Sequence, residues 1–329
     1  MHLLSTTYII FSIVATALAG FDPGSKANLA VYWGQNSAGK QETQTRLSTY
    51  CTDSDIDVIV IAFIDVVNTG TGRFHLNLAN QGYNCTDSSP QYVCLELEAD
   101  IIDCQAKGKT VLLSMGGERA SGEKGYANEV LAKQGAQMIW DTFGPDQSKG
   151  GVFRPFGSAS VDGFDLAFET NVLNIGPFAK ALKELMKTSN KQQYLTAAPM
   201  CANPNEFPKF DDPGLDMVFV QFYNDAQCDQ RANFNFKDWN GWAKNQSTTF
   251  FVGLPAGVSA AQGPSYVIPG NLSTVLENTN GLDRMKGAML WDASQAWSNE
   301  NYHKKVKDAL KALPKRKIRR SPRFAVKSF

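Results

Sequence analysis

Eight short apolar runs, rich in β-branched residues, recur along this chain of 329 residues and constrain its fold more than any other feature. Each run has the length of a buried β-strand, and a longer, more polar stretch separates it from the next. The runs cover residues 28–33, 57–64, 110–115, 161–168, 193–198, 216–222, 249–254 and 286–291. We therefore expect eight strands.

Segments with helical periodicity lie between most of these runs. Apolar and charged residues recur at helical spacing in 95–107, 126–143, 172–187 and 302–313. Strand and helix repeated eight times predict parallel strands closed into an α/β barrel, the (β/α)8 or TIM barrel. One such barrel takes about 250 residues or more, so we expect a single domain.

The carboxyl ends of the strands form the ligand-binding face of such barrels. The residues expected at these ends are Tyr32, Asp65, Gly117, Glu169, Met200, Tyr223, Pro255 and Trp291. Sugar rings present C–H faces to aromatic side chains and hydroxyls to polar ones, so this rim suits a carbohydrate. Phe63, Phe164 and Phe222 are expected to pack in the core instead.

One strand carries the residues that bear most directly on chemistry. Residues 161–169 read Val-Asp-Gly-Phe-Asp-Leu-Ala-Phe-Glu. Alternate side chains along a strand share a face, so Asp165, Ala167 and Glu169 are expected in one row.

This segment resembles the DxxDxDxE signature of family 18 glycoside hydrolases, the chitinases. Asp162, Asp165 and Glu169 match the signature, and Ala167 stands where it has an aspartate. Further blocks resemble the single-domain class III chitinases of fungi and plants: residues 30–36, 113–117, 221–224 and 290–294. The resemblance runs from about residue 21 to about residue 313 and implies the same barrel.

The resemblance also implies a reaction in which the substrate takes part. The N-acetyl carbonyl oxygen attacks the anomeric carbon, while Glu169 protonates the leaving oxygen and later activates water. The missing aspartate would hold the acetamido N–H and offset positive charge on the ring, and Ala167 can do neither. Loss of one preorganised partner of a transition state costs about 10²–10³ in rate.

Substrate binding need not suffer equally, because ground-state contacts come from other side chains. The residues expected to bind substrate are Tyr32, Gln221, Tyr223, Trp291, Met200 and Asp65. Two departures from the family pattern bear on the cleft. Asp65 stands where related chains commonly have asparagine, and Glu118 follows Gly116-Gly117 where a small residue is usual.

Three functions remain open on this evidence. The favoured one is a protein that binds chitin oligosaccharides with lost or strongly impaired hydrolysis, sequesters chitin fragments, and is in effect not an enzyme. The second is a weakly active endochitinase that cleaves β-1,4 linkages between N-acetylglucosamine units, with water or Asp165 partly replacing the missing aspartate. The third is a protein-binding relative, and the retained cleft aromatics argue against it.

Both ends of the chain differ from its body. Residues 1–19 combine an apolar run at 9–14 with a small-x-small pattern at 17–19, which predicts a secretory signal peptide. Residues 315–329 hold seven basic and no acidic residues and are expected to form a disordered tail. Adhesion of this tail to an acidic wall or membrane surface is the alternative. The barrel is then expected to span residues 20–314.

Six cysteines fit a secreted protein, and the resemblance implies the pairs Cys51–Cys104, Cys85–Cys94 and Cys201–Cys228. N-x-S/T sequons begin at Asn84, Asn245 and Asn271.

The chain has three histidines and no C-x-x-C pattern, so we expect no metal and no cofactor. Chitin or its oligosaccharides are the expected partner. We expect no nucleic-acid partner and no membrane span. The protein is expected to be a monomer in the extracellular space or the cell wall.

Overall fold

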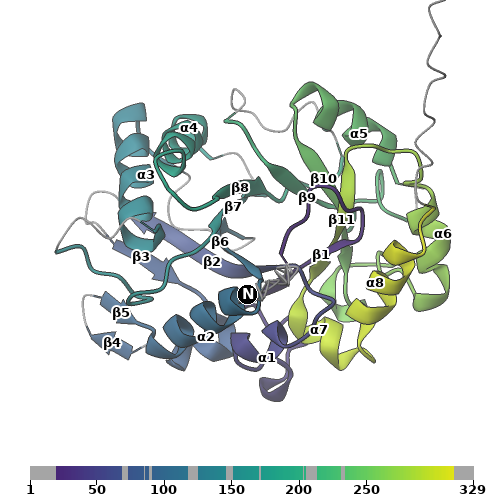
Figure 1. Cartoon of the computed structure of the whole chain (residues 1–329), viewed down its shortest axis with the longest axis horizontal. Helices are drawn as coiled ribbons and strands as arrows, with labels where there is room; N and C mark the ends of the chain where they lie inside the picture. The colour runs from purple at the N-terminus through teal and green to yellow at the C-terminus, as the bar shows by residue number, and fades with distance from the viewer. Residues whose placement is uncertain are drawn as a thin grey trace, which may run out of the picture.

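Eight parallel strands close into a barrel in the computed structural model (Figure 1). The structure describes residues 20–68, 73–84, 86–88, 91–117, 125–145, 151–169, 172–202, 204, 213–230 and 234–314. The barrel strands are β1 (Asn28–Trp33), β2 (Val58–Asn68), β6 (Thr110–Gly116), β7 (Gly163–Ala167), β8 (Tyr194–Ala197), β9 (Met217–Gln221), β10 (Thr249–Pro255) and β11 (Met285–Trp291). Each overlaps one of the eight predicted runs, so the predicted TIM barrel is confirmed.

The barrel closes because β1 pairs with two partners. Its residues pair in parallel with β11 on one side, as in Asn28 with Gly287, and with β2 on the other, as in Ala30 with Val58. The remaining neighbours follow chain order from β6 to β11. None of the eight strands is therefore left as an open edge of the barrel.

Helices surround the barrel on its outside (Figure 1). They are α1 (Leu47–Cys51), α2 (Leu95–Ala106), α3 (Glu129–Phe143), α4 (Ile175–Met186), α5 (Phe236–Asn245), α6 (Leu272–Glu277), α7 (Ala293–Ser298) and α8 (Tyr302–Lys311). The four predicted helical segments are all helical. The second starts three residues later than predicted, because the Asn128 side chain caps it by accepting a hydrogen bond from the Leu131 N–H at 3.0 Å.

The strict alternation of strand and helix is not kept throughout. Between β8 and β9, the part of the chain that the structure describes contains no α-helix. Short 3-10 turns add to the connections: η1 (Gln41–Thr43), η2 (Ala79–Asn84), η5 (Val258–Ala260) and η6 (Pro269–Asn271). The repeat in the sequence thus predicts the strands better than the segments between them.

Two hairpins were not predicted. β2 continues past residue 64 to Asn68 and pairs antiparallel with β3 (Arg73–Leu76), with a register shift between Ile64 and Val66. A second hairpin joins β4 (Thr86–Ser88) to β5 (Gln91–Val93). The extension of β2 matters for function, because it carries Asp65 beyond the barrel wall and along one side of the barrel mouth.

Each strand separates two layers of the core. Leu29, Val31 and Trp33 of β1 belong to the layer between barrel and helices, whereas Ala30 and Tyr32 belong to the layer inside the barrel. Both layers are apolar, and all five residues are at most 2% exposed. Strands buried on both faces read as continuous apolar runs, which explains why the sequence shows runs and not alternation.

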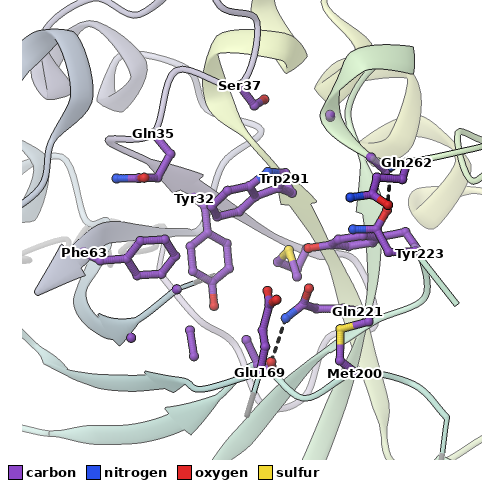
Figure 2. A pocket seen from close by; sticks show the side chains of 18 of the residues that line it. Tyr32, Gln35, Ser37, Phe63, Glu169, Met200, Gln221, Tyr223, Gln262 and Trp291 are labelled. Carbon is purple, nitrogen blue, oxygen red and sulfur yellow. Dashed lines mark hydrogen bonds between the residues drawn. The ribbon is translucent and has the colours of Figure 1, made fainter. Parts of the chain in front are cut away.

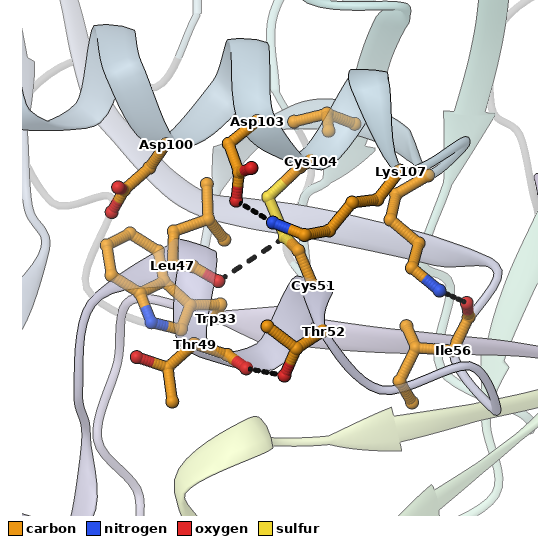
Figure 3. Close-up of a disulfide and its surroundings, with 12 residues drawn as sticks. Trp33, Leu47, Thr49, Cys51, Thr52, Ile56, Asp100, Asp103, Cys104 and Lys107 are labelled. Atoms are coloured by element: carbon orange, nitrogen blue, oxygen red, sulfur yellow. Dashed lines mark hydrogen bonds and ion pairs between the residues drawn. A yellow bond between two sulfur atoms is a disulfide. The ribbon is translucent and has the colours of Figure 1, made fainter.

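Two disulfides fasten the barrel periphery. Cys51–Cys104 joins the end of α1 to α2, with a Cα–Cα distance of 5.1 Å (Figure 3). Cys201–Cys228 links the segments that follow β8 and β9, with a Cα–Cα distance of 5.8 Å. Both are pairs that the family resemblance implied. Cys85, and with it the expected Cys85–Cys94 bridge, lies outside the described residues.

Several other expectations concern residues that the structure does not describe. The expected signal peptide at 1–19, the basic tail at 315–329 and Glu118 all fall in this group. None of the helices in the described parts of the chain is both long and apolar enough to cross a membrane.

Removal of the disulfide that closes the longer loop should destabilise the fold measurably. The bridge between Cys51 and Cys104 closes a loop with a sequence separation of 53. Loop-closure entropy predicts that Cys51→Ala with Cys104→Ala lowers the free energy of unfolding by about 4 kcal/mol. Urea unfolding followed by tryptophan fluorescence measures the loss.

The second bridge is the matched comparison, because its sequence separation is 27. Replacing Cys201 and Cys228 with alanine should cost about 0.5 kcal/mol less than the first double substitution. If the variant without Cys51 and Cys104 unfolds at the same urea concentration as the parent, the bridge does not stabilise the packing of α1 against α2.

Candidate active site

A pocket of about 730 Å³ opens at the carboxyl ends of the barrel strands. Eight of the residues predicted from the sequence line it together: Tyr32, Asp65, Ala167, Glu169, Met200, Gln221, Tyr223 and Trp291. Gly117 also lines it, whereas Pro255 and Asp165 are not among the lining residues. Residues distant in sequence therefore share one cavity because the barrel brings all its strand ends to one rim.

Aromatic rings form one side of this pocket. Trp291 lies 5.4 Å from Tyr32 and 5.8 Å from Phe63, measured between ring centroids, and its plane is stacked at 24° on that of Phe63. The sequence-based assignment of Phe63 to the core is only partly right: the ring is 7% exposed, yet it lines the pocket. Phe164 and Phe222 are fully buried, as expected.

Asp165 lies beneath the pocket and not in its lining. It is fully buried, and its carboxylate accepts hydrogen bonds from Tyr32 Oη at 2.7 Å, Ser114 Oγ at 2.6 Å and Thr196 Oγ1 at 2.6 Å. Burial raises the pKa of the Asp165 carboxyl, and the three hydroxyl donors oppose part of that rise. To act at position 167, the carboxylate would have to break these bonds.

Ala167 and Glu169 stand at the end of β7. Ala167 is 4% exposed and lines the pocket, so this strand position faces the cavity. Glu169 follows two residues later and is exposed. Figure 2 shows its side chain rising into the pocket between Tyr32 and Gln221. Along the predicted row, Asp165 is therefore buried, Ala167 presents a methyl group to the pocket, and Glu169 presents an accessible carboxylate.

The backbone around Ala167 is fixed by a close strand contact. Gly116 of β6 has a φ of +115°, and a Cβ built on it would lie 2.4 Å from the Ala167 carbonyl oxygen. Gly117 donates its N–H to that same oxygen at 2.8 Å. Only glycine tolerates this approach, so the two strands meet backbone to backbone beside the pocket.

Two polar side chains flank Glu169 on the far side of the pocket. Tyr223 is 4% exposed, and burial, with the nearby charges of Glu169 and Asp292, raises its pKa well above its usual value. Its phenol therefore stays protonated as a hydrogen-bond donor. Gln221 donates its amide N–H to the Ala198 carbonyl at 2.9 Å, which fixes the orientation of the amide.

The loop after β1 supplies residues that the sequence analysis did not single out. Gln35 lines the pocket and donates its amide N–H groups to the carbonyls of Ala62 at 2.8 Å and Asn77 at 2.9 Å. Ser37 also lines the pocket and belongs to this loop. Gln35 falls within a block that carried the family resemblance, but a loop has no periodicity that would assign it a role.

A buried carboxylate holds this loop against β11. Asp292 is fully buried and accepts hydrogen bonds from the Ser37 N–H and Oγ, both at 2.9 Å. It also caps α7 by accepting from the Gln295 N–H at 3.2 Å. Because Asp292 follows Trp291 directly, the clamp fixes the aromatic wall and the β1 loop relative to one another.

No obvious metal site accompanies these residues. Within the described ranges, no group of three or more histidine, cysteine, aspartate or glutamate side chains could hold a metal ion. The described lining of the pocket offers the carboxylates of Asp65 and Glu169, tyrosine phenols, amides and aromatic faces.

The role of Asp165 can be tested through stability. Asp165→Ala leaves three buried hydroxyl groups without their acceptor and should lower the free energy of unfolding by about 3 kcal/mol or more. Asp165→Asn keeps one acceptor oxygen and should lose less. Urea unfolding of both variants measures the difference, and equal stability of Asp165→Ala and the parent would contradict a structural role.

The pH dependence of these variants has a definite sign. Because the folded-state pKa of Asp165 is raised, the folded protein holds this proton more tightly than the unfolded chain. The stability of the parent relative to Asp165→Asn should therefore fall as pH rises from about 3.9, the usual pKa of an aspartate, through the raised value. A relative stability that rises over this interval would contradict the effect of burial.

Comparison with known proteins identifies relatives over nearly the whole chain. The chain is 39% identical over 328 residues to "Endochitinase 33" of Trichoderma harzianum, covering 94% of this chain and 100% of that protein. It is 37% identical over 331 residues to "Class III chitinase" of Arthroderma benhamiae, covering 95% and 94% respectively.

Solved structures show that this fold serves more than one function. The chitinase ICChI of Ipomoea carnea superposes with a TM-score of 0.70 at 29% identity, covering 86% of this chain and 99% of that one. The xylanase and alpha-amylase inhibitor protein XAIP-II of Scadoxus multiflorus gives 0.69 at 26% identity, covering 85% and 97%. The barrel alone therefore does not decide the activity.

The expectation that this chain is not an enzyme is wrong. Both fungal relatives, which match nearly its whole length, are named as chitinases. The expectation gave too much weight to one side chain. Loss of a single partner of a transition state lowers a rate by about 10²–10³. A loss of that size slows a reaction without removing the acid or the pocket.

The family itself follows from a match that spans the barrel. The sequence model described as "Glycosyl hydrolases family 18" matches residues 28–311. This range contains all eight barrel strands and every described residue that lines the pocket. The chain belongs to family 18 of the glycosyl hydrolases.

Proposed function

We propose that this protein is a secreted endochitinase that hydrolyses β-1,4 linkages between N-acetylglucosamine units, at a rate lowered by Ala167. One observation carries the proposal: Glu169 extends into the same pocket as Trp291, Tyr223 and Gln221. A carboxylate beside aromatic faces and amides fits a sugar chain with one bond to be protonated.

The proposed reaction uses the substrate's own acetamido group. Glu169 gives its proton to the leaving glycosidic oxygen while the N-acetyl carbonyl oxygen attacks the anomeric carbon. The resulting oxazolinium-like intermediate retains the sugar on the enzyme. Water then attacks the anomeric carbon and breaks its bond to the acetamido oxygen, while Glu169, now a carboxylate, takes a proton from that water. Two displacements at the anomeric carbon leave its configuration retained, and Glu169 is again protonated.

The surrounding side chains position this reaction. Trp291 lies where it can form the floor under the reacting sugar, supported by Tyr32 and Phe63. Tyr223, protonated and next to Glu169, can donate a hydrogen bond to the acetamido oxygen and so orient the internal nucleophile. Ala167 offers no acceptor to the acetamido N–H, and this absent contact is the expected cause of a low rate.

Two substitutions on β7 and its end test the proposal. Glu169→Gln removes the only proposed proton donor and should lower kcat on chitin oligosaccharides by about 10³ or more. Ala167→Asp should raise kcat by about 10²–10³, because it restores a carboxylate facing the acetamido group. Product formation from N-acetylglucosamine oligomers, followed by chromatography, measures both.

Each variant has a matched control. Glu184→Gln makes the same substitution at an exposed residue of α4, outside the pocket, and should leave kcat unchanged. Ala198 directly follows β8 and lines the same pocket. Ala198→Asp therefore adds a carboxylate at a different place in the pocket and should not raise kcat. Full activity of Glu169→Gln would contradict the assigned acid, and equal rates for Ala167→Asp and the parent would contradict the assigned cause of slowness.

Trp291→Ala should separate binding from catalysis. Truncating an aromatic floor typically costs about 2 kcal/mol or more of binding free energy, so oligosaccharide affinity should fall at least about tenfold. Calorimetric titration measures the affinity, and circular dichroism checks that the barrel still folds. An unchanged affinity would place the ligand outside this pocket.

A further inference from the structure

The pocket has an uneven charge. Among its described lining residues, Asp65 and Glu169 have acidic side chains, and none is lysine, arginine or histidine. Chitin is neutral along its whole length, because every amino group carries an acetyl group. A neutral substrate gives the second carboxylate, Asp65, no charged partner.

Asp65 is held at the side of the pocket by the extension of β2. Its side chain is 15% exposed, and its Oδ1 accepts a hydrogen bond from His75 Nδ1 of β3 at 2.6 Å. His75 is 48% exposed and is not among the residues that line the pocket. One hydrogen bond orients the carboxylate, and an ionised carboxylate has about four acceptor positions, so it can also bind a ligand.

The two carboxylates enter the pocket from separate strands. β6 lies between β2 and β7 in the sheet, so β2 and β7 are two strand spacings apart. At about 4.8 Å for each spacing, this separation is on the order of 10 Å. Asp65 is therefore placed to meet a different sugar unit from the one whose bond Glu169 protonates.

We propose that Asp65 is a specificity-determining residue that selects a glucosamine unit, with a free ammonium group, beside the N-acetylated unit at Glu169. The preferred substrate is then partially deacetylated chitin. This inference rests on the proposed function and deepens it. A carboxylate that loses part of its hydration on binding needs a charged or strongly donating partner, and an ammonium supplies both.

The two units must differ in the proposed reaction. The unit at Glu169 keeps its acetyl group, because the acetamido oxygen is the nucleophile. The unit at Asp65 takes no part in bond breaking, so its amino group is free to be an ammonium. An acetamide at Asp65 would offer one neutral N–H and would bring a bulky acetyl group against the carboxylate.

The test compares two substrates across matched variants. Fully acetylated and partially deacetylated chitin oligosaccharides of the same length are given to the parent, Asp65→Asn, His75→Gln and Glu184→Gln. Mass spectrometry of the products locates the glucosamine unit relative to the cleaved bond. Asp65→Asn should lower kcat/KM on the partially deacetylated oligomer by about tenfold or more, the size of one charge-assisted contact.

The same substitution should lower kcat/KM on the fully acetylated oligomer by a smaller factor, so that the ratio of the two kcat/KM values falls toward one. His75→Gln leaves the carboxylate in place and removes the imidazole that occupies one of its acceptor positions, so it should keep or strengthen the preference. Glu184→Gln changes net charge equally on an exposed face of α4 and should resemble the parent. High salt should weaken the parent's preference and leave that of Asp65→Asn unchanged.

Failure of this inference is distinct from failure of the proposed function. If Asp65→Asn affects both oligomers equally, Asp65 contacts a hydroxyl and selects no charge, while the chitinase proposal stands. If the parent cleaves neither oligomer, the chitinase proposal fails, and calorimetric affinities of the same pairs still decide the selectivity. Equal affinities of the parent for both oligomers would then overturn the role of Asp65.

Discussion

The closure of the barrel through β1 is the constraint on which the rest of the structure depends. β1 pairs with β2 and with β11, so the first and last strands of the barrel become neighbours. Tyr32 at the end of β1 and Trp291 at the end of β11 thereby lie 5.4 Å apart, although most of the chain separates them in sequence. Without this closure, the pocket would lose its aromatic wall and the Asp292 clamp on the β1 loop.

The strands could be predicted because burial on both faces leaves a simple mark in the sequence. A strand such as β6 must be apolar toward both the helices and the barrel interior, so it reads as a continuous run. The connections carry weaker marks. The extension of β2 and the β4–β5 hairpin depend on pairings outside the barrel, and the start of α3 depends on a single capping side chain, Asn128.

Eight of the residues that line the pocket could be predicted from the sequence, but the burial of Asp165 beneath them could not. Alternation along β7 indicated that Asp165, Ala167 and Glu169 share a face, yet Asp165 lies under the pocket because Tyr32, Ser114 and Thr196 enclose its carboxylate from three other strands or strand ends. Such long-range hydrogen bonds leave no local pattern.

The contact between Gly116 and the Ala167 carbonyl has a consequence for engineering. Since the two backbones touch without an intervening side chain, the frame around position 167 is set by main-chain atoms. A side chain introduced at 167 grows into the cavity and has little means of displacing the strand. A carboxylate can therefore be introduced at position 167 without a change in the backbone around it. The difference in rate between the two forms then measures what that one carboxylate contributes to catalysis.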